Sequence, residues 1–213
     1  MKAVNAVAPI WLLLPLLFPL GACDTIIGTH QQHAPPKGSI FEDEYWYVSR
    51  RQDTVRLAVD SERVLFVSAD TSENAYEALR EQVAQQVGPV DVASRGTHAS
   101  FVIVRPFPDE ARIERFMAEH PEVRVKPVFE TLRHETGEAV VELAGDTTQN
   151  AAHLFADKAG LRVLYKMLSG ANEYVFLDLN WPNSSTVTTS RDLYRFPEVL
   201  NAVPSFRGYF RPL

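Results

Sequence analysis

The sequence predicts an α+β fold in which two ferredoxin-like (βαββαβ) subdomains follow one another after an N-terminal β-hairpin. Three observations indicate this fold. Short runs of β-branched and aromatic residues alternate with segments whose apolar residues recur every three or four positions, the periods of strands and helices. The order strand, helix, strand, strand, helix, strand occurs twice along the chain. An aromatic strand pair around a polar break precedes both copies.

The hairpin is expected at 45–48 and 54–57, because aromatic and β-branched residues there flank the polar segment 49–53. The first subdomain is predicted over residues 41–135. Its elements are strands at 64–67, 90–93, 101–104 and 123–132 and helices at 73–87 and 109–120. Gly88 and Pro121 follow the two helices as stop signals. We expect its core to contain Val64, Phe66, Leu79, Val83, Val102, Val104 and Phe116.

The second subdomain is predicted over residues 136–213 and repeats the order with little sequence identity. Its elements are strands at 138–143, 161–168, 174–179 and 206–210 and helices at 147–159 and 188–202. Gly160 ends the first of these helices, and Pro197 disturbs the second. Glu142 and Asp178 alternate with apolar residues, so we expect both to face water. The expected core residues are Val141, Leu154, Phe155, Val175, Leu177 and Leu193.

The first 22 residues have the pattern of a secretory signal peptide, with Lys2 before an apolar run at 10–20. Gly21 and Ala22 then precede Cys23, which is the single cysteine of the chain. This ending resembles the lipobox of bacterial lipoproteins, and the resemblance implies cleavage before Cys23 and lipid attachment to its thiol. We therefore expect a protein of the bacterial cell envelope, anchored through acyl chains in a membrane that the sequence does not specify.

Residues 23–40 have few apolar side chains and several prolines and glycines, so they are expected to form a flexible tether. His30 and His33 in this segment suggest a metal site, but a solvated linker is the favoured interpretation because acidic and further histidine partners are missing there. The net charge of −6 argues against nucleic acid as a partner. We expect no bound metal and no cofactor.

Catalytic motifs are scarce. The serines lack a Gly-x-Ser-x-Gly context, and the chain has neither a His-Glu-x-x-His motif nor a glycine-rich phosphate loop. Glu130, His134 and Glu135 lie close together and suggest a metal or acid–base cluster. The favoured interpretation is a polar loop between the two subdomains. The prediction is that the protein is not an enzyme, while a hydrolase with an unrecognised site remains an alternative.

Several segments together resemble the N-terminal prodomain region of fervidolysin-like subtilases. They are the aromatic strand pair, the strand 64–67, the strand 174–177, the helical residues 193–194 and 199–200, and the closing aromatic strand 206–210. The resemblance covers residues 45–213 and depends on pattern. In that family a protease domain follows, whereas this sequence ends at Leu213 without the Asp, His and Ser segments of a subtilase triad. The usual Glu-Pro pair near the cleavage site is also absent.

The resemblance implies a binding module that inhibits a subtilisin-like protease or assists its folding. A prodomain tail binds in the protease cleft as an extended strand, so the expected partner-binding residues are Phe206, Tyr209, Phe210 and Arg211. The alternative function is a structural or assembly lipoprotein that contacts another envelope protein, because a shared fold does not determine function.

Overall fold

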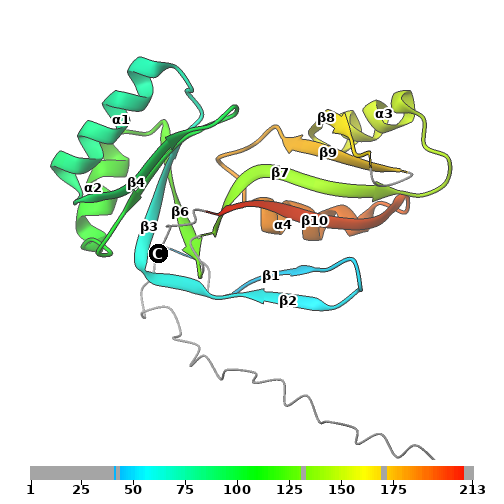
Figure 1. Ribbon diagram of the computed structural model, residues 1–213, viewed down its shortest axis with the longest axis horizontal. Coiled ribbons are helices and arrows are strands. Elements are labelled where there is room, and N and C mark those ends of the chain that lie inside the picture. Colours follow the sequence, from blue (N-terminus) through cyan, green and yellow to red (C-terminus); the bar gives the residue numbers. More distant parts are fainter. Residues whose placement is uncertain (1–40, 42–43, 131–132, 169–171, 209–213) are drawn as a thin grey trace, which may run out of the picture. The chain divides into compact units, whose positions relative to one another are not determined.

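The computed structural model describes residues 41, 44–130, 133–168 and 172–208. The hairpin comes first, with β1 at Tyr45–Val48 and β2 at Thr54–Leu57 paired antiparallel. The remaining strands form an eight-stranded sheet with the order β4-β5-β3-β6-β7-β9-β8, and β10 pairs with β7. Figure 1 shows the two successive groups of strands and helices that the sequence pattern predicts.

The first half of the fold covers residues 59–129. It contains β3 (Val59–Ser68), α1 (Glu73–Gln86), β4 (Val90–Arg95), β5 (Ser100–Val104), α2 (Glu110–Glu119) and β6 (Val123–Phe129). Its strands lie in the order β4-β5-β3-β6, all antiparallel to their neighbours, which is the ferredoxin-like arrangement. Ser72 and Asp109 cap the two helices by accepting hydrogen bonds from main-chain N–H groups.

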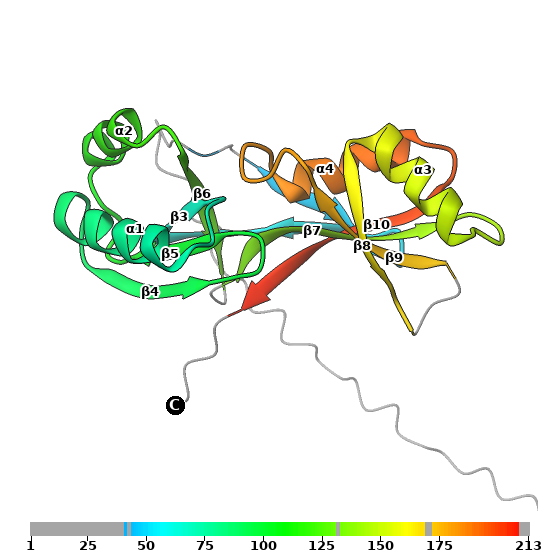
Figure 2. The same ribbon diagram turned by 90° about the horizontal axis from the view of Figure 1, so that it is seen from above.

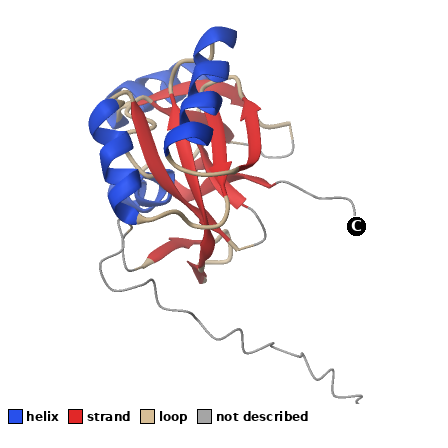
Figure 3. Ribbon diagram, turned by 90° about the vertical axis from the view of Figure 1, so that its left-hand side faces the viewer, coloured by secondary structure: helices blue, strands red, loops and turns tan. Residues whose placement is uncertain are grey.

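The second half covers residues 133–208. It contains β7 (Arg133–Leu143), α3 (Gln149–Ala159), β8 (Leu161–Lys166), β9 (Glu173–Asp178), α4 (Thr186–Asp192), a 3₁₀ turn at Leu193–Arg195 and β10 (Val199–Gly208). The strand order β8-β9-β7-β10 repeats the order of the first half. In Figure 2, α3 and α4 lie on the same side of β7 and β10, and Figure 3 shows the helices gathered on one side of the strands. The predicted pair of ferredoxin-like units is confirmed.

Most predicted core residues are buried. All seven of the first half belong to one apolar cluster that joins the inner face of its sheet to α1 and α2. In the second half Val141, Phe155, Val175, Leu177 and Leu193 are buried. Leu154 is 71% exposed, so its assignment to the core is wrong. The helix instead turns Ala152, Phe155 and Ala156 inward, and all three belong to the apolar cluster of the second half.

The end of the chain also differs from the prediction. The helix expected at 188–202 stops at Asp192, and residues 199–208 form β10, a longer strand than the expected 206–210. Pro197 lies in the connection, where a proline removes a helical hydrogen bond and clashes with the preceding turn. Val199 and Ala202 then face the core beside β7, so tertiary packing favours the strand over the helix.

The segment where the halves meet is the third difference. The expected polar loop is wrong for His134 and Glu135, which lie in β7 with 0% and 1% of their surface exposed. The predicted boundary between residues 135 and 136 falls within this strand. Asp178, expected to face water, is also buried, because its carboxylate accepts hydrogen bonds from Ser184 and Thr189.

Candidate functional site

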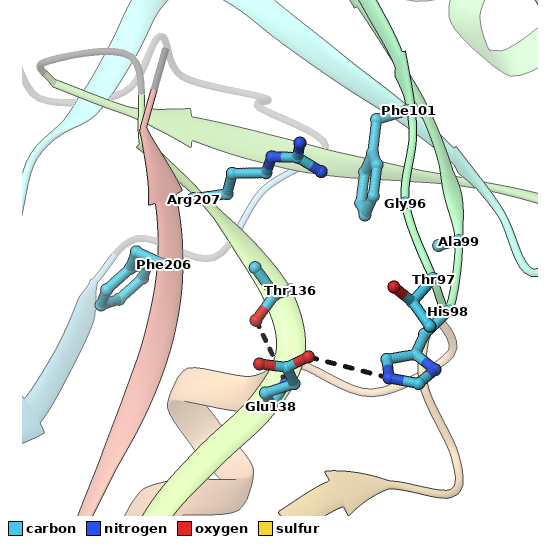
Figure 4. A pocket seen from close by; sticks show the side chains of 9 residues that line it. All are labelled: Gly96, Thr97, His98, Ala99, Phe101, Thr136, Glu138, Phe206 and Arg207. Atoms are coloured by element: carbon cyan, nitrogen blue, oxygen red, sulfur yellow. Dashed lines mark hydrogen bonds and ion pairs between the residues drawn. The ribbon is translucent and has the colours of Figure 1, made fainter. Parts of the chain in front are cut away.

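A polar cleft lies between the turn that joins β4 to β5 and the strands β7 and β10. Its volume is about 270 Å³, and Figure 4 shows the side chains that line it. It is therefore built from both halves of the fold. The lining residues are Gly96, Thr97, His98, Ala99, Phe101, Thr136, Glu138, Phe206 and Arg207.

Local structure shapes both walls of the cleft. In the β4–β5 turn the N–H of Gly96 donates to the carbonyl of Ala99 at 2.8 Å. A Cβ on Gly96 would lie 3.0 Å from that oxygen and 3.0 Å from the ring of Phe101, so this tight turn favours glycine. On the opposite wall the hydroxyl of Thr136 donates to the carbonyl of Ser205 at 3.2 Å and joins β7 to β10.

One charged contact crosses the cleft. His98 Nε2 lies 3.8 Å from Glu138 Oε1, and the two side chains are 20% and 26% exposed. In Figure 4 they approach each other from opposite walls. At this distance the contact is an ion pair only when His98 is protonated, and a pair with this exposure contributes little to stability. The cleft thus presents a carboxylate, an imidazole and, from the exposed Arg207, a guanidinium to a bound molecule.

His134 lies behind the cleft wall, and its ring is buried. Its centroid is 4.7 Å from that of Phe101 on β5, and its Nδ1–H donates to the carbonyl of Glu135 at 2.9 Å. The pKa of His134 is lowered to about 4, chiefly by burial and to a smaller extent by the charge of Arg207, while the hydrogen bond to the Glu135 carbonyl opposes the shift. The imidazole is therefore neutral at neutral pH, which suits a position between two halves of a core.

Glu135 points to the opposite face of β7, where it joins β7 to the start of α4. Its Oε1 accepts hydrogen bonds from the hydroxyl of Ser185 at 2.6 Å and from the N–H of Val187 at 2.9 Å. Burial raises its pKa, and these bonds, together with the charge of Lys126, reduce the shift. The N–H groups in the first turn of a helix have no hydrogen-bond partner within the helix. At the start of α4 the carboxylate of Glu135 supplies such an acceptor.

The loop before α4 is held against β6 of the first half. Arg124 Nε donates to Asn183 Oδ1 at 2.7 Å, and Lys126 Nζ donates to the carbonyl of Ser184 at 2.6 Å. The ammonium of Lys126 also lies 5.1 Å from the centre of the Trp181 ring. Polar and cation–π contacts therefore join the two halves on the side of the sheet that carries this loop.

These side chains do not form a metal or catalytic cluster of the expected kind. Glu130 is exposed, while His134 and Glu135 are successive residues of a strand and point to opposite faces. Within the described parts of the chain, no three or more His, Cys, Asp and Glu side chains converge on a metal position. The cleft offers hydrogen-bonding and charged groups beside aromatic rings, a combination suited to binding.

The predicted site residues are only partly described. Cys23, Tyr209, Phe210 and Arg211 lie outside the described residues, as do His30 and His33. Phe206 is half-buried in β10. Its ring centroid lies 5.8 Å from that of Phe129 and 6.0 Å from that of Tyr47.

His98, Glu138 and Arg207 were not among the predicted site residues. They come from three separate elements, and no spacing in the sequence relates them. The turn at Gly96 was the only local signal of the cleft.

None of the described helices has the length and apolar composition needed to cross a bilayer. A search of protein-family models finds no match to the chain, and a search of curated proteins finds none either. Among solved structures, the small subunit of acetolactate synthase from Thermotoga maritima is similar over 70% of this chain and 98% of its own length, with 10% sequence identity and a TM-score of 0.25. A similarity this weak carries no argument about activity, so the functional proposals depend on the residues themselves.

Proposed function

We propose that the protein is a bacterial envelope lipoprotein, anchored through acyl chains on Cys23, whose folded part is a non-catalytic binding module of the prodomain type. The signal peptide and lipobox support the anchor. The two ferredoxin-like units and the aromatic closing strand support the likeness to a prodomain. The expected partner is a subtilisin-like protease, which the module inhibits or helps to fold.

The observation that carries this proposal is the position of β10. Among the described residues β10 forms a ladder with β7 alone, and the hairpin strand β1 lies against β10 without pairing with it. Pro204 lies within β10, as is usual for strands at the edge of a sheet. An extended partner segment binds to such an edge through main-chain hydrogen bonds, and side-chain pockets then add selectivity. The polar cleft lies beside the last residues of this strand.

The packing of Phe206 refines the expected contact residues. Because its ring contacts Phe129 and Tyr47, this side chain contributes to the fold. The residues after Gly208 are therefore the better candidates for direct contact with a protease, and Tyr209, Phe210 and Arg211 are the members of the predicted set that lie there.

An inhibition assay tests the proposal with two soluble chains that begin at residue 24. The intact chain should inhibit a subtilisin-like protease of the same cell, and a chain ending at Gly208 should inhibit much less. A chain ending at Ser205 is a poor test, because it removes residues 206–208 that pair with Glu135, His134 and Arg133 of β7. Absence of inhibition by the intact chain, together with no effect on refolding of the protease, would overturn the proposal and favour a structural role in the envelope.

A further inference from the structure

The polar cleft carries opposite charges at its two ends. In the β7–β10 ladder Arg207 lies opposite His134, and Glu138 lies further along β7. Because a strand rises about 3.4 Å per residue, the main-chain positions that carry the guanidinium and the carboxylate are at most about 13 Å apart along the strand. In Figure 4 Thr136 lies between the two charged side chains. A molecule that fills the cleft therefore meets a cation at one end and an anion at the other.

The turn between β4 and β5 forms the facing wall and approaches both charged groups. A Cβ on Gly96 would lie 3.7 Å from Nη1 of Arg207, so the guanidinium extends across the cleft to the start of the turn. At the other end Nε2 of His98 lies 3.8 Å from Oε1 of Glu138. This distance is longer than a hydrogen bond, so the carboxylate keeps acceptor positions for a ligand. Thr97 lies between Gly96 and His98 in the chain and also lines the cleft.

Both walls pack against the same buried side chains, so the cleft has its shape before a ligand binds. Phe101 lines the cleft, is 4% exposed and belongs to one apolar cluster with Trp181. In the other wall Gly137 separates Thr136 from Glu138, and it packs so closely on the Trp181 ring that an added Cβ would lie 2.6 Å from it. A preformed site has less conformational entropy to lose when a small molecule binds, which favours binding.

We propose that the cleft binds a short zwitterionic peptide of about two or three residues, with its carboxylate on Arg207 and its ammonium on Glu138. A guanidinium matches a carboxylate through two parallel N–H donors, and a carboxylate accepts hydrogen bonds from an ammonium. The hydroxyls of Thr97 and Thr136 line the cleft where the peptide groups of such a ligand lie. The proposal concerns the cleft alone and depends neither on the lipid anchor nor on contact with a protease.

The separation of the charged ends determines the length of the ligand. A free amino acid carries both charges on one carbon atom, so it is too short to reach both ends. Each further residue of an extended peptide adds about 3.3–3.6 Å, and the long side chains of Arg207 and Glu138 cover part of the remaining gap. The cleft volume of about 270 Å³ is just below the usual range for small-molecule sites, so a longer peptide does not fit inside it.

Calorimetric titration of the full chain, carrying Cys23→Ser and kept in detergent, tests the proposal. Dialanine and trialanine are the probes, and at least one of them should bind with saturation. Alanine and acetate should bind at least about tenfold more weakly, because each reaches only one end of the cleft. The N-acetylated and the C-amidated forms of the bound peptide each lack one charge, and each should lose a similar factor.

Two substitutions assign the two ends. Arg207→Gln should weaken binding of the free peptide at least about tenfold and change binding of the C-amidated peptide little, because that ligand has no carboxylate. Glu138→Gln should act in the same way on the free and the N-acetylated peptide. Arg162→Gln removes an exposed arginine of β8 outside the cleft and should bind like the wild type. Circular dichroism checks the fold of each variant, and the end-blocked peptides test the proposal on the wild type if a variant does not fold.

Several results would overturn the proposal. One is the absence of saturable binding of either peptide to the wild type. Another is binding of acetate as tight as that of the peptides, which would indicate a simple anion site. Equal binding of the free and the end-blocked peptides would show that the charged ends are not recognised. Equal losses in Arg162→Gln and Arg207→Gln would show a general effect of charge in place of a contact in the cleft.

Discussion

Removal of the Glu135 carboxylate should destabilise the protein more than removal of any other single carboxylate in β7. In Glu135→Ala the hydroxyl of Ser185 and the N–H of Val187 lose their acceptor. Val187 is 1% exposed, so water does not replace the bond that its N–H loses, whereas Ser185 is partly exposed. A buried donor left without its acceptor typically costs about 1–3 kcal/mol, and we expect a loss of that size in the free energy of unfolding.

Urea denaturation at neutral pH, followed by circular dichroism, measures this loss. Glu138→Ala is the matched control, because it lies on the same strand with a side chain 26% exposed, and its cost should stay under about 1 kcal/mol. Glu135→Gln retains one oxygen as acceptor and removes the charge, so its stability should lie within about 1 kcal/mol of the wild type. Equal losses for Glu135→Ala and Glu138→Ala would refute the reasoning.

The pH dependence of the same variants gives an independent check. The folded pKa of Glu135 lies above its unfolded value, so the folded state binds more protons in the window above pH 4.5. The wild type should therefore become more stable relative to Glu135→Gln as the pH falls through the folded pKa. A constant difference between the two proteins from about pH 8 to about pH 5 would contradict the assigned burial of the charge.

Three further predictions concern the anchor and the packing. Metabolic labelling with a fatty acid should mark the wild type and not Cys23→Ser; a labelled variant would exclude Cys23 as the attachment site. Phe155→Ala should lower the unfolding free energy by about 3–5 kcal/mol, against less than about 0.5 kcal/mol for the exposed Leu154→Ala, as measured by urea denaturation; similar losses would contradict the observed orientation of the helix. Gly137→Ala should lower the thermal stability more than Gly145→Ala. Both glycines have a positive φ, but only the Cβ added at position 137 would lie 2.6 Å from the ring of Trp181. Thermal unfolding of the two variants measures the difference.

The two ferredoxin-like units could be predicted from the sequence because their helices and strands are indicated by local sequence patterns. Apolar periodicity, the polar caps at Ser72 and Asp109, and the stop at Gly160 each depend on neighbours within one or two turns. The lipobox around Cys23 is likewise a local pattern. It predicts the lipid anchor, and fatty-acid labelling can test that prediction. These features need no knowledge of distant contacts.

Tertiary structure decided what happens between the units. The sequence pattern predicts a helix at residues 199–202, but in the structure these residues form a strand that pairs with β7. The sequence pattern predicts a polar loop at His134 and Glu135. In the structure both lie in one strand and are buried on opposite faces, His134 against Phe101 and Glu135 against the start of α4. The cleft residues His98 and Glu138 are 40 positions apart and meet only after both halves have formed. Burial of polar groups depends on partners far along the chain, and therefore the sequence alone predicts the elements but not the junction that they build.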